Sequence, residues 1–292
     1  MDLHTVTDVV SPAGPGQWRP GDAWLGGGTA LFAEPRPRVR RLLDLAAAGW
    51  PPITVREDGL EIAATCTVAE LFAFTGAPQF EAFHQIARGC CRAFLASFKI
   101  WNVATVGGNI CSALPAGPMI ALTAALEGTC LILGNDGAQR RLPVAALVTG
   151  DGRTALAPGE LLRSVHLPAW ALTGFAAYRQ GSLHAHGRSA TLLAGRLDTD
   201  GSLTLTVTAA TFRPYQLRFP TLPTAEVLQV ALTNAIPDGG YVSDPHGSAA
   251  WRRHLTRRHA EQIRRELAAG PPDGVPGAAG RDAGEDEAPA WR

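Results

Sequence analysis

The chain has 292 residues, of which 46% are hydrophobic and 18% charged, and its 26 Lys and Arg residues balance 26 Asp and Glu residues. This composition excludes a disordered or highly charged protein, and the length favours two packed domains. A net charge of zero argues against nucleic acid as a partner, because that affinity depends on an excess of basic residues that neutralise phosphates. Lys99 is the only lysine, and its singularity predicts no function.

Neither a targeting segment nor a membrane span is expected. Residues 1–10 lack the basic stretch and apolar core of a signal peptide, and no window reaches about 18 consecutive apolar residues. We therefore expect a cytoplasmic protein. No Cys-x-x-Cys pair indicates zinc or an iron–sulfur cluster, so reduced and mostly buried thiols are favoured over a strained disulfide between adjacent Cys90 and Cys91. The five cysteines are Cys66, Cys90, Cys91, Cys111 and Cys130.

Residues 1–52 alternate turn-rich stretches with short apolar runs, and the first clear elements follow them. Residues 53–56 and 60–64 are predicted strands, joined by a turn at Glu57, Asp58 and Gly59. Thr67 and Glu70 have the spacing of a capping box, which predicts a helix start there. Further helices are expected over residues 80–94 and 118–126, the latter beginning at Pro118, because proline suits the first helical turn.

A long loop, residues 99–116, is expected between these helices, followed by strands at 131–133 and 165–167. The alternation over residues 203–208 predicts a strand with one buried and one solvated face. Ser248 is expected to cap an amphipathic helix with an apolar stripe formed by Trp251, Leu255, Ile263 and Leu267. Its arginines are expected mostly on other faces, and their binding to an acidic partner is the less favoured alternative. Residues 271–292 are rich in Gly, Pro and acid and predict a disordered tail.

Two glycine-rich segments are the main candidates for a ligand site. Residues 24–31 and 104–110 contain Gly26-Gly27-Gly28-Thr29 and Thr105-Val106-Gly107-Gly108-Asn109. Neither matches a P-loop, and the first lacks the third glycine of a dinucleotide fingerprint. Both offer backbone N–H groups free of Cβ obstruction, so two such loops facing each other indicate a cofactor that carries phosphate.

Together these segments resemble the flavin-binding subunit of the molybdenum hydroxylases, the family of xanthine dehydrogenase and aerobic carbon monoxide dehydrogenase. Gly26 to Leu31 is similar to the family's Ala-Gly-Gly-Thr-Asp-Leu loop, and residues 102–109 are similar to its Thr-Ile-Gly-Gly-Asn loop. The resemblance continues through residues 42–45, 159–168 and 244–253 and spans residues 3–268.

The resemblance implies an α+β fold and a division of the chain into two domains. Residues 1–168 would form a two-lobed FAD-binding domain of the vanillyl-alcohol-oxidase-like type. Residues 169–270 would form a small α+β domain of the carbon monoxide dehydrogenase flavoprotein type, with helices on an antiparallel sheet. Residues 271–292 remain as the tail.

The resemblance also implies the residues that contact FAD. Both loops would bind mainly the diphosphate and ribityl chain, Leu95 and Leu162 would supply apolar contacts, and Arg179 takes the place of a family lysine near the flavin. The implied cofactor-binding residues are Trp24, Leu25, Gly26, Gly27, Gly28, Thr29, Ala30, Leu31, Leu95, Thr105, Val106, Gly107, Gly108, Asn109, Leu162 and Arg179. No catalytic acid or base and no metal ligand is predicted. His184 and His186, two residues apart, are expected on one face of a strand, but no carboxylate or Cys cluster accompanies them, so metal binding is the less favoured interpretation.

The implied function is that of an oxidoreductase subunit. FAD would take electrons from a separate [2Fe–2S] subunit of a complex whose molybdopterin-containing large subunit hydroxylates the substrate, and would pass them to NAD or another soluble acceptor. Three departures favour an alternative, a structural or assembly subunit that binds FAD weakly or not at all. Ala30, Trp101 and Pro118 replace an acidic or polar residue, an arginine and an aspartate of the family, and losing one charged hydrogen bond weakens affinity by about ten- to a hundredfold.

Overall fold

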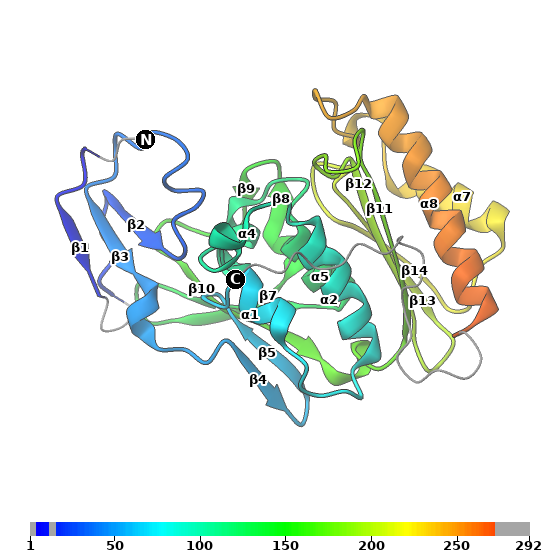
Figure 1. Ribbon diagram of the computed structural model, residues 1–292, viewed down its shortest axis with the longest axis horizontal. Coiled ribbons are helices and arrows are strands. Elements are labelled where there is room, and N and C mark those ends of the chain that lie inside the picture. The colour runs from blue at the N-terminus through cyan, green and yellow to red at the C-terminus, as the bar shows by residue number, and fades with distance from the viewer. Residues whose placement is uncertain (1–3, 12–15, 272–292) are drawn as a thin grey trace.

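The computed structural model describes residues 4–11 and 16–271, and three sheets and the helices between them organise these residues (Figure 1). The first sheet contains β1 (Asp8–Val10), β3 (Arg41–Asp44) and β2 (Asp22–Leu25) in that order, and both pairings are parallel. A short 3₁₀ helix, η1 (Leu45–Ala48), follows β3. These strands were not predicted, because runs of only three or four residues are too short to show a periodic pattern.

The second sheet is antiparallel, with the strand order β4-β5-β10-β6-β7. Its strands are β4 (Ile53–Arg56), β5 (Gly59–Ala63), β10 (Leu161–Pro168), β6 (Thr129–Leu133) and β7 (Gln139–Pro143). The expected hairpin and the strands near residues 131–133 and 165–167 are therefore confirmed. Helix α6 (Val144–Leu147), the small hairpin of β8 (Val148–Gly150) and β9 (Arg153–Thr154), and η2 (Ala169–Ala171) complete this region.

Helices follow β5 as the sequence predicts, with one correction. Helix α1 (Val68–Ala73) has the capping box of Thr67 and Glu70, and α2 (Glu81–Ala93) and α5 (Pro118–Ala125) match the two predicted helices. The expected loop over residues 99–116 instead contains α3 (Phe98–Trp101) and α4 (Val106–Ser112). Thr105 caps α4 through a hydrogen bond from the Gly108 N–H, so two glycines lie within a helix despite their low helix propensity.

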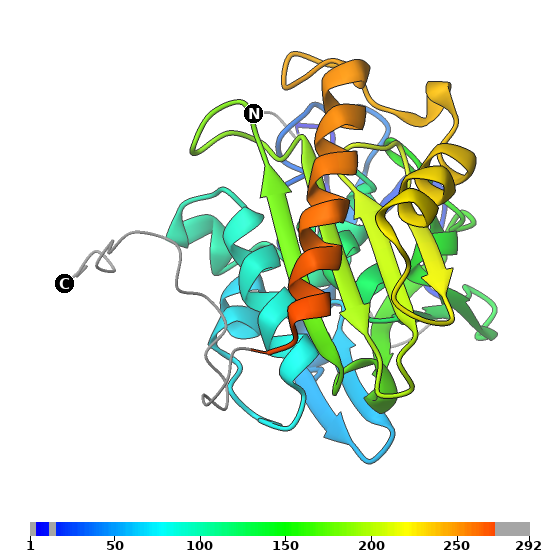
Figure 2. The ribbon, with the colours of Figure 1, turned by 90° about the vertical axis from the view of Figure 1, so that its right-hand side faces the viewer.

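The third sheet is antiparallel and lies between two layers of helices (Figure 1). Its strands, in order, are β11 (Phe175–Gly181), β12 (Thr191–Leu197), β13 (Leu203–Thr208) and β14 (Tyr215–Phe219). Helix α8 (Ala249–Ala269) packs lengthwise on β11 and β12, as Figure 2 shows. Helix α7 (Ala225–Ala235) packs on β14, and η3 (Asp238–Gly240) follows it in the chain. On the other face, α2 packs on β11 and α5 on β12 and β13. The α+β class is thus confirmed.

The two-layered covering corrects the expectation that β13 has a solvated face. All six of its residues are buried; Leu203, Leu205 and Val207 join the core under α7 and α8. The alternate threonines, Thr204, Thr206 and Thr208, belong to the other face of the sheet. Alternation therefore identified the strand but misidentified its polar face as solvated, because α5 covers it.

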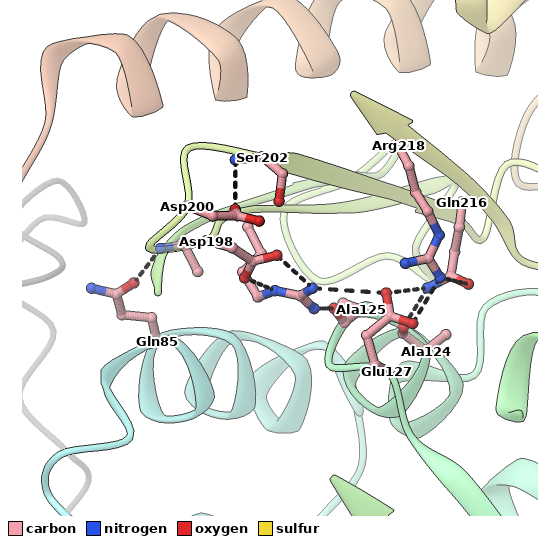
Figure 3. Close-up of polar contacts among 11 residues, drawn as sticks. Gln85, Ala124, Ala125, Glu127, Asp198, Asp200, Ser202, Gln216 and Arg218 are labelled. Atoms are coloured by element: carbon pink, nitrogen blue, oxygen red, sulfur yellow. Dashed lines mark hydrogen bonds and ion pairs between the residues drawn. The ribbon is translucent and has the colours of Figure 1, made fainter. Parts of the chain in front are cut away.

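A polar network joins this face of the sheet to the end of α5 (Figure 3). The Arg196 Nη1 donates to the Ala125 carbonyl at 2.6 Å, and the Gln216 amide donates to the Ala124 carbonyl at 2.7 Å. Arg196 is buried and is also paired with Asp198, while Arg218 pairs with Glu127. These donors satisfy carbonyls at the C-terminal end of α5, where a positive charge is favourable.

A second buried arginine is the one exception to the expected face assignment of the last helix, whose Ile263 and Leu267 are buried and whose other arginines are not. Arg252 of α8 is almost fully buried and donates to the carbonyls of Ala190 and Ala209, each at 2.8 Å, and it pairs with Asp244. The guanidinium of Arg252 is therefore engaged by groups within the protein and does not face a partner. The expected tail, except residue 271, lies outside the described residues, and no helix within the described ranges is long and apolar enough to cross a membrane.

Candidate cofactor-binding site

The first glycine loop leaves β2 and packs directly against the second segment. Gly26 follows Leu25, the last residue of β2. A Cβ on Gly27 would lie 1.5 Å from the Val103 carbonyl oxygen, so no larger residue fits there without moving the backbone. Gly28 adopts a φ of +72°, which favours glycine. The loop is therefore positioned by close contact with the chain just before α4.

The second glycine loop forms the start of α4 and contacts β5. The Gly107 N–H donates to the Ala64 carbonyl at 2.9 Å, and a Cβ on Gly107 would lie 2.4 Å from that of Ala64. Gly108 is exposed, and its N–H donates to the Thr105 hydroxyl at 3.0 Å. Gly107 thus packs against the sheet region, whereas Gly108 faces outward.

Both loops line one groove of 250 Å³, which we call the glycine groove. Thr105 and Gly108 come from the second loop, and Trp24 and residues 26–31 come from the first. Val106 and Gly107 are buried, so their side of the loop supports the groove from behind. The structure therefore brings the two segments together as the sequence predicted. Its lining residues are Trp24, Gly26, Gly27, Gly28, Thr29, Ala30, Leu31, Arg36, Thr105, Gly108, Cys111 and Ser112.

An unpartnered donor lies at this groove. The indole Nε1 of Trp24 is buried and has no hydrogen-bond acceptor among residues 4–11 and 16–271. A buried N–H without a partner costs about 1–3 kcal/mol, so a ligand that supplied an acceptor would be favoured. Together with the Cβ-free lining, this donor fits an extended ligand rich in hydrogen-bond acceptors.

Arg36 adds a positive charge that the sequence motifs did not reveal. It lines the glycine groove, and its Nη2 lies 3.8 Å from a carboxylate oxygen of Glu34. Both side chains are well exposed, so this pair is weak and leaves the guanidinium available for an anion. Arg36 belongs to no recognisable motif, and only the fold shows that it reaches the groove.

A larger cleft of 420 Å³ opens beside the N-terminal end of α5, and we call it the α5 cleft. Its walls are mainly apolar and include Leu95, Leu114 and Pro118. The other lining residues His186, Arg188 and Ser189 come from the segment between β11 and β12. Asn109 lines it too, and its side-chain oxygen accepts a hydrogen bond from the Met119 N–H at 3.0 Å. Among the described residues, no acidic side chain lines this cleft, and Pro118 occupies the position where the resemblance implied an aspartate.

His184 and His186 lie in the loop between β11 and β12, not on a strand as predicted. Two residues of spacing therefore do not place them on one face. No group of three or more metal-ligating side chains occurs within the described ranges. His186 instead contributes to the α5 cleft, and neither it nor Arg188 has a hydrogen-bond or ion-pair partner in the described chain.

A third cleft of 400 Å³, the Trp50 cleft, adjoins the glycine groove. Gly26, Gly27 and Thr105 line both hollows, so the two are continuous. The α5 cleft shares no lining residue with either, but one of its lining residues, Asn109, directly follows Gly108 of the glycine groove in sequence. Residues of the second glycine loop therefore contribute to all three hollows. The other residues of the Trp50 cleft are Ala46, Gly49, Trp50, Pro52, Thr65, Thr67, Glu70, Asn102 and Val103.

Five of the implied contact residues do not line these three hollows: Leu25, Val106, Gly107, Leu162 and Arg179. Leu162 of β10 is 2% exposed and packs in the core. Arg179 of β11 donates to the Tyr178 carbonyl and to Glu266 of α8. Trp101 uses its indole N–H to bond the Phe94 carbonyl at 2.9 Å.

The cysteines are free thiols in this structure, including the adjacent Cys90 and Cys91. All except Cys111 are buried, and burial raises the pKa of the Cys91 and Cys130 thiols to about 12. A thiol with so high a pKa carries almost no thiolate at neutral pH. The four buried cysteines, Cys66, Cys90, Cys91 and Cys130, therefore belong to the core.

Comparison with known proteins identifies the family. Residues 17–170 match the FAD binding domain in molybdopterin dehydrogenase, and the chain belongs to this family. Membership confirms the resemblance seen in the sequence and FAD as the cofactor, which the glycine groove, its unpartnered indole N–H and Arg36 all suit.

Two curated relatives are plant proteins. The chain is 34% identical over 123 residues to xanthine dehydrogenase of Oryza sativa subsp. japonica, which covers 40% of this chain and 9% of that protein. It is 28% identical over 155 residues to xanthine dehydrogenase 2 of Arabidopsis thaliana, covering 49% and 11% respectively. The aligned parts thus span about a tenth of these relatives.

Solved structures show that the fold extends over nearly the whole chain. Quinoline 2-oxidoreductase from Pseudomonas putida 86 superposes with a TM-score of 0.75 at 20% identity, covering 92% of this chain and 99% of that one. Carbon monoxide dehydrogenase from Hydrogenophaga pseudoflava superposes with a TM-score of 0.71 at 18% identity, covering 90% and 96%. The likeness therefore includes the third sheet with α7 and α8, beyond the residues of the family match.

Proposed function

We propose that this chain is the FAD-binding electron-transfer subunit of a molybdenum-dependent hydroxylase or dehydrogenase complex. It would take electrons from a separate [2Fe–2S] subunit and pass them to NAD or another soluble acceptor, while a molybdopterin-containing subunit oxidises the substrate. The observation that carries this proposal is the glycine groove, where two loops distant in sequence meet beside an unpartnered indole N–H and a cation.

The three hollows suggest how the chain would hold FAD. The glycine groove would bind the diphosphate through backbone N–H groups, the Thr29 and Thr105 hydroxyls and Arg36. The α5 cleft, with apolar walls at Leu95 and Pro118 and a polar edge at Arg188, suits the flavin ring, which has an apolar and a polar end. The Trp50 cleft would then receive the adenosine.

The contribution of this chain would be placement and electrostatics rather than acid–base chemistry. FAD, when bound, exchanges electrons singly or in pairs, which suits a carrier between clusters and a two-electron acceptor. The unpaired Arg188 and His186 would hold the polar edge of the ring, and the apolar wall opposite would exclude water. No residue is assigned as a catalytic acid or base.

Partner subunits follow from the same proposal. The buried thiols of Cys66, Cys90, Cys91 and Cys130 cannot form a cluster site without unfolding the core, so electrons would have to arrive from another polypeptide. Five free thiols also suit the reducing environment of the cytoplasm, where we place the complex.

The first test is the visible absorption spectrum of the purified chain, followed by titration of FAD into protein emptied of cofactor. Saturable binding of one FAD per chain would support the electron-transfer role. A folded chain that binds no FAD, even with its partner subunits, would favour the structural alternative that Pro118 suggests. Pro118→Asp tests that alternative directly: restoring a carboxylate to the α5 cleft should tighten FAD binding by about tenfold, if one charged hydrogen bond is regained.

A further inference from the structure

Apolar side chains gather on the surface around α3. Leu95, Phe98, Ile100 and Val103 are four of the thirteen large apolar side chains exposed within the described ranges, and Phe98 is the most exposed of all at 63%. Phe72 of α1, also exposed, contacts the Trp101 ring with centroids 5.3 Å apart. A cluster of this kind, unlike scattered apolar residues, is typical of an interaction surface.

The charges around this cluster have one sign. Residues 82–126 contain no Asp or Glu, yet they carry Arg88, Arg92 and Lys99, and all three are exposed. Arg88 lies beside Phe72 in the furrow between α1 and α2. Glu70, on the neighbouring α1, is bound back to Thr67. We call these apolar and basic residues together the α3 face: Phe72, Arg88, Arg92, Leu95, Phe98, Lys99, Ile100 and Val103.

The α3 face continues into the proposed FAD site. Leu95 belongs to it and also lines the α5 cleft, and Val103 belongs to it and also lines the Trp50 cleft. A protein covering this face would therefore lie against the walls of the cofactor site. The electron donor and the electron acceptor must both approach FAD closely, and the donor is the one of the two that the proposed function makes a protein subunit of the complex.

We propose that the α3 face is the docking surface for the iron–sulfur electron donor, whose matching surface has an apolar centre and an acidic rim. This inference rests on the proposed function. A second copy of this chain fits less well, because a symmetric contact would place Arg88, Arg92 and Lys99 against like charges. Basic and apolar surfaces also bind anionic membranes, so that occupant is tested as the rival.

Because the chain has a single lysine, cross-linking at its side-chain amine can test the proposed docking contact. Lys99 supplies the only side-chain amine in the chain. A carbodiimide joins an amine to a carboxylate that touches it, with loss of water and without a spacer. In the complex isolated through an affinity tag on the full chain from its own host, we expect Lys99 to be coupled to an Asp or Glu of the iron–sulfur polypeptide.

Variants then test the surface against a matched control. Phe98→Asp and Lys99→Glu should each lower the acid-labile sulfide recovered per FAD by at least about tenfold, as expected for a central anchor or a reversed charge. Val230→Asp, at an apolar residue of α7 that is 59% exposed, should leave that ratio unchanged. Equal FAD content per chain in all three variants would show that the fold and the cofactor site are intact.

Four results would overturn the inference: sulfide retained by both α3 variants, equal loss in Val230→Asp, a wild-type chain that holds FAD but recovers no sulfide, or coupling of Lys99 elsewhere. If the FAD-loaded chain binds phosphatidylserine vesicles and Phe98→Asp abolishes this binding, the face would be assigned to a membrane instead. A wild-type chain that binds no FAD would instead contradict the proposed function itself.

Discussion

Both glycine loops contain a glycine that packs too closely on a neighbouring segment to leave room for a Cβ, but the contacted atoms differ. In the first, Gly27 presses on backbone, because its Cβ would lie 1.5 Å from the Val103 carbonyl oxygen. In the second, Gly107 presses on the Ala64 side chain and backbone. Each loop also has a glycine, Gly26 or Gly108, whose Cβ position meets only the Thr105 side chain. One glycine of each loop therefore builds the scaffold, and another keeps the groove open.

Within one Gly-Gly motif, packing of the scaffold and opening of the groove therefore belong to different glycines. A Gly-Gly pair reads as one signal in a sequence, yet Gly107 is buried and Gly108 is exposed. Stability and cofactor affinity should therefore respond to different members of the same pair. Substituting Gly107 and Gly108 together would confuse the two effects.

The largest effect is expected for Gly27→Ala. Because backbone cannot move aside as a flexible side chain can, we expect the free energy of unfolding to fall by about 3 kcal/mol or more, measured by urea denaturation of the FAD-free chain. Gly239→Ala, where a Cβ would meet nothing within 4 Å, is the control and should change little. Equal stability of the two variants would contradict the packing role of Gly27.

Gly107→Ala and Gly108→Ala should separate stability from binding. Gly107→Ala should lose about 2 kcal/mol of stability through contact with Ala64. Gly108→Ala weakens the Thr105 cap but gains helix propensity, two effects of about 1 kcal/mol each that nearly cancel. Its added methyl group should still keep the diphosphate from the backbone and weaken FAD binding by at least about tenfold, as titration would measure. Full affinity in a folded Gly108→Ala would remove Gly108 from the site.

Arg36→Gln should weaken FAD binding by about five- to tenfold while leaving stability unchanged. The guanidinium is exposed, so its attraction to a diphosphate is partly screened and should fall further as salt is added. The wild-type dissociation constant should therefore depend more steeply on salt than that of the variant. Arg38→Gln, an exposed arginine outside the groove lining, is the matched control; an equal loss there would indicate only a general charge effect.

The smallest effect is a change in labelling rate. Cys111 is the one exposed cysteine of the described residues and lines the glycine groove, although burial of its sulfur raises the pKa of the thiol to about 12. A maleimide should therefore react slowly with the native chain and modify Cys111 before the four buried cysteines. FAD should slow this reaction several-fold by covering the groove, and mass spectrometry of peptides would locate the label. Labelling of Cys111 at an unchanged rate under saturating FAD would place the cofactor elsewhere.

Local signals predicted much of the fold. The capping box at Thr67, the hairpin over residues 53–64 and the helix starting at Pro118 were readable because each depends on neighbours in sequence. The short parallel strands before residue 45 were not, because parallel partners are distant and each strand carries too few residues for a period. The wrong face assignment of β13 has the same origin: only the packing of α5 determines what its threonines meet.

Part of the candidate site could also be predicted from local sequence signals. Glycines at Gly26–Gly28 and Gly107–Gly108 signal a close approach whatever the partner, so both loops were found. Arg36, His186 and Arg188 carry no such signal, since exposed charged residues occur throughout the sequence. Leu162, for which the resemblance implied an apolar contact to FAD, is buried in the core, and that contact stays a prediction.

The hydrogen bonds from Arg196 and Gln216 to the end of α5 connect the FAD-binding region to the third sheet. The N-terminal end of this helix borders the α5 cleft, and its other end is fastened to the third sheet through Arg196 and Gln216. The far side of the cleft comes from residues 186–189. A fragment limited to residues 17–170 would retain both glycine loops, yet it would expose the faces of α2 and α5 that pack on the third sheet and would lack three of the eleven residues that line the α5 cleft. If the flavin ring lies in that cleft as proposed, such a fragment would hold FAD less well than the full chain.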